Sequence, residues 1–148
     1  MVQVTPFLLV LSLALMAHGL PERKCVLTGH WINDLGSNMT IHKLQENGSF
    51  NGTYLTVPSM SPKKIPPSPL LGFQQHTDQP TFGFTVKWKS TNTITVFTGQ
   101  CFLNDDGNEV LDTMWLLRLD ADSEKHNWNA TLIGINIFTC LHAQKERG

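Results

Sequence analysis

The segment Pro80-Thr81-Phe82-Gly83-Phe84-Thr85-Val86-Lys87-Trp88 alternates apolar and small polar residues along its length. Phenylalanine, valine and tryptophan occupy the even positions from 82 to 88, and Thr, Gly, Thr and Lys occupy the odd positions from 81 to 87. Because successive side chains of a strand point to opposite faces, this pattern predicts a strand that buries one face. No segment longer than a few residues keeps a helical period, so the chain is predicted to be all-β.

Further segments on both sides of this strand are also predicted to be strands. They are rich in β-branched and aromatic residues and are separated by turn-forming residues such as those of 104–108. Segment 57–69 holds five prolines and is predicted to be a long loop, since proline cannot donate a ladder hydrogen bond. Segment 121–127 is polar and is also predicted to be a loop. The predicted strands are Thr28–Asn33, Asn38–Leu44, Ser49–Thr56, Leu70–His76, Thr81–Trp88, Thr93–Phe102, Glu109–Leu119 and Trp128–Leu141.

Eight sequential strands joined mostly by short turns predict an eight-stranded antiparallel up-and-down β-barrel. A β-sandwich is the alternative architecture, but a sandwich usually needs longer crossover connections. An eight-stranded barrel has an interior just wide enough for one small ligand. The fold class therefore already favours a binding protein.

The last two predicted strands are apolar on both faces. Met114 and Leu116 alternate with Trp115 and Leu117, and the segment 132–138 is largely apolar at both odd and even positions. One face of a lone barrel meets water, so a second apolar face predicts burial against another subunit. The alternative is a cover formed by a loop of the same chain.

The beginning of the chain predicts export. The uncharged apolar run 7–17 is far shorter than the ~20 residues that a membrane span needs, and Ala17-His18-Gly19 offers the small residues that a signal peptidase prefers. We expect residues 1–19 to be a secretory signal peptide and residues 20–148 to be one extracellular domain. The formal net charge is −1, and no basic stripe is present, so we expect neither nucleic acid nor a membrane as a partner.

In a secreted protein, cysteines can form disulfides and Asn-x-Ser/Thr motifs can be glycosylated. The chain has three cysteines, Cys25, Cys101 and Cys140, so one is left over or pairs between chains. The residues alone leave three intrachain pairings open. The candidate N-glycosylation sites are Asn38, Asn47, Asn51 and Asn129.

Binding fits the sequence better than catalysis. No nucleophile motif is present, and the histidines lack metal-ligand spacing. Large aromatics share strand ends and faces with polar residues, among them Asn33, Ser37 and Thr56. A buried polar group without a partner costs ~1–3 kcal/mol, and a polar ligand would supply the partner. The alternative is that these groups pair with each other or with water, and each aromatic alone is more often part of a core.

Five motifs together resemble the avidin family, the biotin binders that include streptavidin. They are W-x-N-D-L-G-S-N-M-T at 31–40, P-T-F-G-F-T-V-x-W at 80–88, V-F-T-G-Q-C-F at 96–102, M-W-L-L-R at 114–118 and G-I-N-I-F-T at 134–139. The resemblance runs from about Arg23 to Glu146 and is closer to animal avidins than to streptavidin. It implies a secreted, glycosylated homotetramer without a cofactor. Such a protein binds biotin tightly without catalysis, to deplete the vitamin around microbes or to store it for an egg.

The resemblance also implies a role for each site residue. Asn33, Ser37 and Tyr54 would surround the ureido oxygen of biotin, and Thr56 and Asn136 would accept from the ureido N–H groups. Of the other implied residues, Thr95 would face the sulfur, Trp88, Phe97 and Trp115 would wall the ring system, Leu117 would pack at the floor, and Ser59, Ser61, Thr91 and Thr93 would receive the carboxylate.

Further implications concern assembly and cysteines. Trp128 would reach the pocket of a neighbouring subunit, and Cys25 would pair with Cys101. Cys140 then lies just beyond the apolar segment 133–138, which raises the hypothesis of a disulfide between subunits. A buried free thiol is the alternative.

Two other readings remain. One is a lipocalin, a carrier of a small apolar ligand, because Gly29-His30-Trp31 matches the G-x-W of that family. A lipocalin, however, has a longer chain, a helix after the barrel and a more apolar interior. The other reading is an extracellular structural module whose pocket is vestigial.

Overall fold

The structure is a computed structural model that describes residues 23–56 and 64–141. The predicted signal peptide and the predicted ligand contacts Ser59 and Ser61 lie outside these residues. Within them the chain forms eight strands and one short 3₁₀ helix. The elements are β1 Gly29–Asn33, β2 Asn38–Ile41, β3 Ser49–Leu55, β4 Ser68–Gln74, β5 Thr81–Lys87, β6 Ile94–Leu103, β7 Glu109–Arg118, η1 Glu124–Asn129 and β8 Thr131–Cys140.

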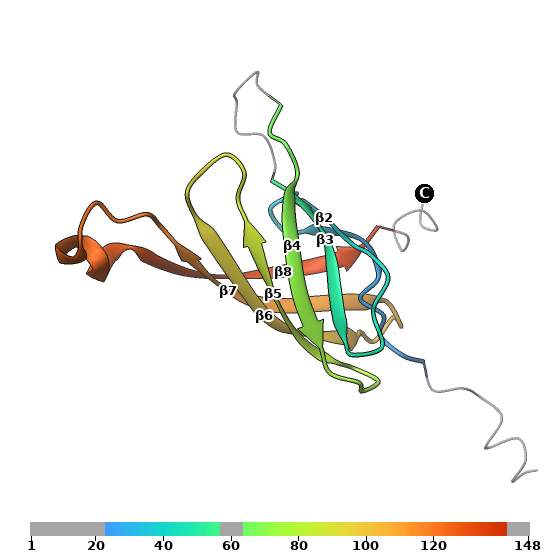
Figure 1. Ribbon diagram of the computed structural model, residues 1–148. Helices are drawn as coiled ribbons and strands as arrows, with labels where there is room; N and C mark the ends of the chain where they lie inside the picture. The colour runs from blue at the N-terminus through green and yellow to red at the C-terminus, as the bar shows by residue number, and fades with distance from the viewer. Residues whose placement is uncertain (1–22, 57–63, 142–148) are drawn as a thin grey trace, which may run out of the picture.

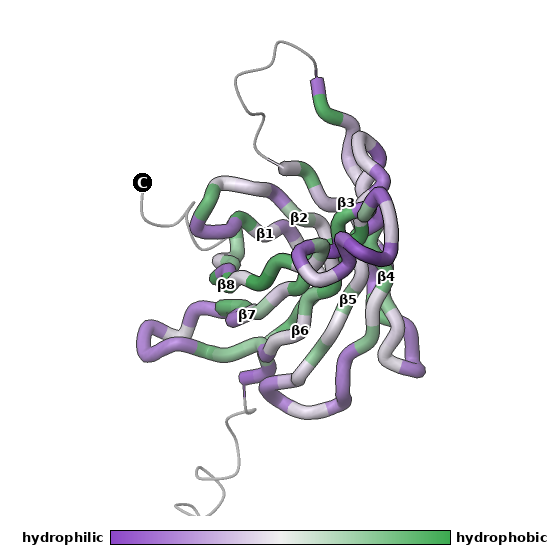
Figure 2. The backbone as a smooth tube through the Cα atoms, turned by 90° about the vertical axis from the view of Figure 1, so that its left-hand side faces the viewer, coloured by the Kyte–Doolittle hydropathy of each residue, from purple (hydrophilic) through white to green (hydrophobic). Residues whose placement is uncertain are grey.

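The strands close into a barrel in chain order. Each strand pairs antiparallel with the next, and β8 returns to pair with β1. Figure 2 looks along the barrel and shows the strands following one another around a ring. The predicted eight-stranded up-and-down β-barrel is therefore confirmed, and the sandwich is excluded.

Four predicted strand boundaries are wrong by two or more residues. β2 ends at Ile41 and not at Leu44, and β4 ends at Gln74 and not at His76. β4 begins at Ser68, so Pro69 lies within the strand opposite Thr53; it is the second residue, where a missing N–H is tolerated. The last strand begins at Thr131, and Trp128 and Asn129 belong to η1. Short-range hydrogen bonds from the amides of His126 and Ala130 to the carbonyls of Ser123 and Asn127 wind this segment instead.

The apolar positions that alternate along the sequence are the buried positions of the strands. In β5, residues 82, 84 and 86 are buried, and the residues between them are exposed or half-buried. The rings of Phe84 and Phe97 stack with their centroids 4.6 Å apart. The fully buried Trp31 donates from Nε1 to the carbonyl of Leu27, 2.8 Å away. Aromatic side chains thus form a large part of the barrel core.

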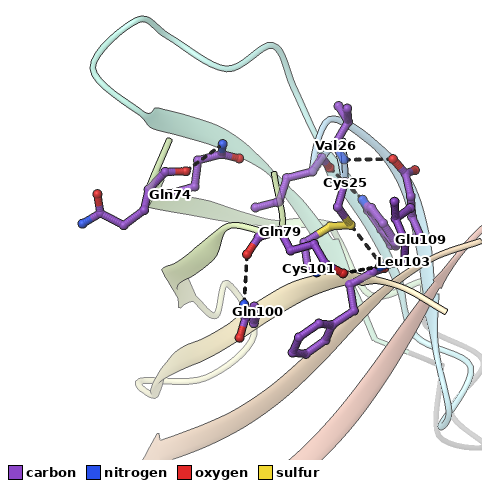
Figure 3. Close-up of a disulfide and its surroundings, with 12 residues drawn as sticks. Cys25, Val26, Gln74, Gln79, Gln100, Cys101, Leu103 and Glu109 are labelled. Carbon is purple, nitrogen blue, oxygen red and sulfur yellow. Dashed lines mark hydrogen bonds between the residues drawn. A yellow bond between two sulfur atoms is a disulfide. The ribbon is translucent and has the colours of Figure 1, made fainter. Parts of the chain in front are cut away.

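The predicted disulfide between Cys25 and Cys101 is confirmed, and it ties the segment before β1 to β6 (Figure 3). Further bonds hold the same corner. The amide of Val26 donates to the carboxylate of Glu109 over 2.8 Å, and Gln79 accepts from Gln100 and Leu103 through its two oxygens. The N-terminal segment is therefore a tethered part of the fold.

The outer face of β7 and β8 is apolar and open. Met114 is 50% exposed, Ile133 is 67% exposed and Ile135 is 68% exposed. No described residue covers them, so no loop within the described part of the chain buries this face. A second apolar area lies over β4, where Leu71 and Phe73 border a groove of about 600 Å³.

The topology gathers the functional residues at one end of the barrel. In an up-and-down barrel all odd strands end at the same rim, so the turns after β1, β3, β5 and β7 lie together. η1 follows β7 and projects from this rim (Figure 1). No helix among the described residues is long and apolar enough to span a bilayer.

Candidate functional site

Asn33 organises the polar end of the site. Its Oδ1 accepts from the amides of Leu35, at 3.0 Å, and Ser37, at 2.8 Å, and so shapes the turn between β1 and β2. Gly36 makes this turn possible with a φ of 85°. Because Oδ1 is occupied by amides, Nδ2 must face inward, where it donates to the hydroxyl of Tyr54 over 3.0 Å.

Three side chains that can donate hydrogen bonds, those of Asn33, Ser37 and Tyr54, thus lie close together. Asn33, Ser37 and Tyr54 are 6%, 7% and 4% exposed, respectively, and the Tyr54 hydroxyl is hydrogen bonded to both other side chains. Burial raises the pKa of Tyr54 to about 12, although these two hydrogen bonds lower it and the nearby Asp34 raises it further. Tyr54 therefore remains a neutral donor at physiological pH, which suits a carbonyl oxygen.

The pKa of Tyr54 gives a pH prediction. The unfolded chain releases this proton near pH 10.0, whereas the native protein holds it until about pH 12. The stability is therefore intact below pH 10 and falls as the pH rises toward 12, by about 2 kcal/mol. Tyr54 is the sole tyrosine, so phenolate absorbance follows it directly, and Tyr54→Phe is the control for other groups. Ionisation of the native protein near pH 10 would contradict the prediction.

Next to Asn33 in the chain, Asp34 fixes Asn136 on the paired strand β8. The Asp34 Oδ1 accepts from Nδ2 of Asn136 over 2.8 Å, while the Asp34 amide donates to the carbonyl of Ile137 over 3.0 Å. Since Nδ2 of the buried Asn136 is engaged, its Oδ1 is left to accept from a ligand. The hydroxyl of Thr113 on β7 donates to the backbone carbonyl of Asn136 over 2.8 Å and so also holds Asn136 in place.

Aromatic rings surround Tyr54. Tyr54 packs edge-on against Trp88, with centroids 5.3 Å apart, and stacks on Phe97 at 5.7 Å. Nε1 of Trp88 donates to the hydroxyl of Thr95 over 2.8 Å, which fixes the indole. Trp115 and Leu117 have the inward alternation of β7 and are half-buried.

The mouth of the site is more open. The hydroxyls of Thr91 and Thr93 are 2.6 Å apart in the exposed turn between β5 and β6, and Thr56 is half-buried at the end of β3. Ser59 and Ser61, the other two predicted residues here, lie outside the described residues. The structure thus brings the described inward-facing residues to one end of the barrel.

Trp128 stands apart from this site. It is 81% exposed on η1, which Arg118 holds by donating to Asn127 over 2.6 Å and to Thr131 over 3.2 Å. An indole so exposed does not complete the site of its own chain. Its predicted contact with a neighbouring subunit stays a prediction.

The remaining predicted positions are at the surface or at a strand end. Asn38, Asn47, Asn51 and Asn129 are all exposed, as glycosylation requires. Cys140 forms no disulfide within the chain and is half-buried. It shares the alternation of the buried Asn136 and Phe138, not that of the apolar outer face. A disulfide between subunits would therefore form at the end of β8 and not across that face.

Sequence reasoning missed the two residues that hold Asn136 in place. Asp34 stands in the motif at 31–40, but nothing local shows that its partner lies 102 residues away. Thr113 is a buried threonine on β7, and only the alternation with Trp115 could have indicated that it points inward. No group of three or more His, Cys, Asp or Glu in the described residues could hold a metal.

A closed eight-stranded barrel with buried polar side chains and aromatic rings at one end has the architecture of a class of small-ligand binding proteins. Comparison with known proteins gives the family. The Avidin family model matches residues 21–141, and the chain belongs to that family. The family is non-enzymatic, in agreement with the prediction.

Relatives match over most of their length. Avidin of Gallus gallus is 56% identical over 142 residues, which are 94% of this chain and 93% of avidin. The crystal structure of xenavidin superposes with a TM-score of 0.76 at 52% identity, covering 80% of this chain and all of the other. A solved structure described as a biotin binding protein from chicken gives 0.74 at 49% identity, with the same coverage of 80% and 100%.

Proposed function

We propose that this protein binds biotin in its barrel and has no catalytic activity. The observation that carries the proposal is the pair of buried amides, Asn33 and Asn136, on the adjacent strands β1 and β8. Asn33 and Tyr54 offer N–H and O–H donors, and Asn136 offers an amide oxygen whose Nδ2 is already engaged by Asp34. A ureido group has the complementary pattern, because it combines one carbonyl oxygen with two N–H groups.

We propose for each residue the role that membership of the avidin family implies. Asn33, Ser37 and Tyr54 donate to the ureido oxygen, and Asn136 and Thr56 accept from its N–H groups. Trp88, Phe97 and Trp115 enclose the rings, Thr95 faces the sulfur and Leu117 forms the floor. Thr91, Thr93, Ser59 and Ser61 receive the carboxylate at the mouth. Donors that are already in place need little ordering on binding, which favours high affinity.

A tryptophan-fluorescence titration of the purified protein tests the function. We expect stoichiometric quenching at one biotin per chain, because indoles wall the site. Retinol serves as a parallel ligand. A response to retinol alone would indicate a lipocalin-like carrier of an apolar ligand, and no response to either would indicate a structural module with a vestigial pocket.

We also propose that the protein is a homotetramer. Large exposed apolar faces on both β7–β8 and β4 need cover in water, and two distinct faces allow more than a dimer. Trp128 then closes the site of a neighbour. A disulfide through Cys140 would lock such a pair covalently, and a denatured sample that runs only as monomer without reductant would reject that bond.

The outer face of β8 gives a prediction for assembly. Ile135→Glu places a charge in the centre of the proposed interface, where its desolvation is costly, so we expect the tetramer to split into smaller species. Thr77→Glu is the control for an added charge, because Thr77 is an exposed polar residue in the turn between β4 and β5, outside β7 and β8. Sedimentation velocity distinguishes the two variants. An intact tetramer of Ile135→Glu would remove this face from the assembly.

Export and modification complete the proposal. The protein is secreted after removal of residues 1–19 and carries glycans at some of its four exposed sequons. Biotin is a ligand and not a cofactor. Its capture serves to deplete the vitamin around microbes or to store it, and mass spectrometry of the secreted protein tests the cleavage and the glycans.

A further inference from the structure

The position of the Trp115 indole depends on a glycine. Gly134 lies directly opposite Trp115 in the register of β7 and β8. A Cβ atom at Gly134 would come closer than 3.0 Å to Cζ2, Cε2 and Cη2 of that indole. The indole of Trp115 therefore occupies the space beside the β8 backbone that a side chain at position 134 would fill.

This contact differs from those of other strand glycines. A Cβ at Gly52 would meet the carbonyl oxygen of Thr40, and one at Gly99 would meet that of Asp112. Those glycines allow strand backbones to approach one another. At Gly134 the three nearest atoms all belong to the side chain of Trp115, so a substitution there acts on the wall of the site.

Nothing else in the described residues fixes the indole by a directed bond. Nε1 of Trp115 is buried and has no hydrogen-bond partner among them, in contrast to Nε1 of Trp88, which donates to Thr95. The β8 backbone behind Gly134 is held in the ladder with β7. A displaced indole can therefore move only away from β8, toward the interior of the barrel.

We infer that Gly134 is a positioning residue for ligand binding, which sets the plane of the Trp115 indole and thereby the width of the site. The inference rests on the proposed biotin site. Gly134 does not touch the ligand itself; it acts through Trp115. A methyl group in its place narrows the space between Trp115 and the facing aromatic rings.

The test compares Gly134→Ala, Trp115→Ala and the double variant, with Gly83→Ala as the matched control. Gly83 also lies inside a strand, but its Cβ would meet only the carbonyl oxygen of Phe97, at 3.3 Å. We expect Gly134→Ala to release radiolabelled biotin about 10- to 100-fold faster, the scale of an overpacking penalty expressed as a binding constant. Gly83→Ala should release it at the native rate.

The double variant separates positioning from a general loss of stability. With the indole absent, the added methyl has no partner to displace, so the double variant should release biotin at the rate of Trp115→Ala alone. The inference is overturned if Gly134→Ala leaves the rate unchanged, or if it adds the same factor in both backgrounds. If Gly134→Ala fails to fold, the double variant must fold, and its failure would also overturn the inference.

A crystal structure of Gly134→Ala distinguishes this inference from the proposed function. We expect the indole to be displaced toward the interior, and an unmoved indole overturns the inference whatever the ligand. If the native protein and Gly83→Ala do not bind biotin, the proposed function fails, and the displacement alone then decides the role of Gly134.

Discussion

Asn33→Ala is expected to weaken biotin binding by about 10²- to 10³-fold, the scale seen when one preorganised donor to a developing oxyanion is removed. The loss has two sources. Nδ2 no longer donates toward the ligand oxygen, and the amides of Leu35 and Ser37 lose their acceptor. Leaving these amides without a partner costs about 1–3 kcal/mol each where they are buried, so the turn that holds Ser37 loosens as well.

Asn33→Asp separates these two sources. A carboxylate keeps an acceptor for the amides of Leu35 and Ser37 but cannot donate to the ligand. We therefore expect Asn33→Asp to lose affinity while its thermal midpoint without ligand stays closer to native than that of Asn33→Ala. Isothermal titration and calorimetry measure the two quantities. Equal affinity of native protein and Asn33→Asp would remove Asn33 from the donor set.

Loss of the Cys25–Cys101 disulfide is the largest expected stability effect. The bond closes a loop across a separation of 76 residues, which contributes about 4 kcal/mol in the chain-entropy description. For a domain of this size that corresponds to a fall in Tm of about 10–15 °C for Cys25→Ser/Cys101→Ser. Calorimetry at one fixed protein concentration measures it, since assembly makes Tm depend on concentration.

Cys140→Ser is the matched control for that experiment. Cys140 is a half-buried cysteine that forms no bond within the chain, so its replacement should change Tm by much less. A double serine variant at 25 and 101 that melts with the native protein would mean that neighbouring bonds, such as those of Glu109 and Gln79, are enough to hold the corner.

The fold could be predicted from the sequence because every second residue of a strand is buried in this barrel. Thr81–Lys87 shows the rule, since the residues predicted to face inward are the buried ones. The predicted start of the last strand was wrong because local composition favoured a strand where the chain has to turn. Trp128 has strand propensity, yet it lies in η1, because the chain must turn before the amide of Leu119 can bond to Ala130.

Most residues of the proposed site could be predicted from the motifs, but the residues that hold them in position could not. Asn33 and Asn136 stand in recognisable stretches, whereas the bond that orients Asn136 comes from Asp34, far away in the chain. The space that admits the Trp115 indole is a missing side chain on the neighbouring strand. Such cross-strand relations depend on register, which a single sequence leaves open.

The closure of the barrel has a consequence for its motions. β1 and β8 share only three register pairs, whereas β6 and β7 share ten. We expect this short seam to open first, so its amides should exchange hydrogen fastest among the ladders. Asn33 and Asn136 lie on the two strands of this seam, so the proposed ligand, bound by both, would hold the seam closed and slow its hydrogen exchange.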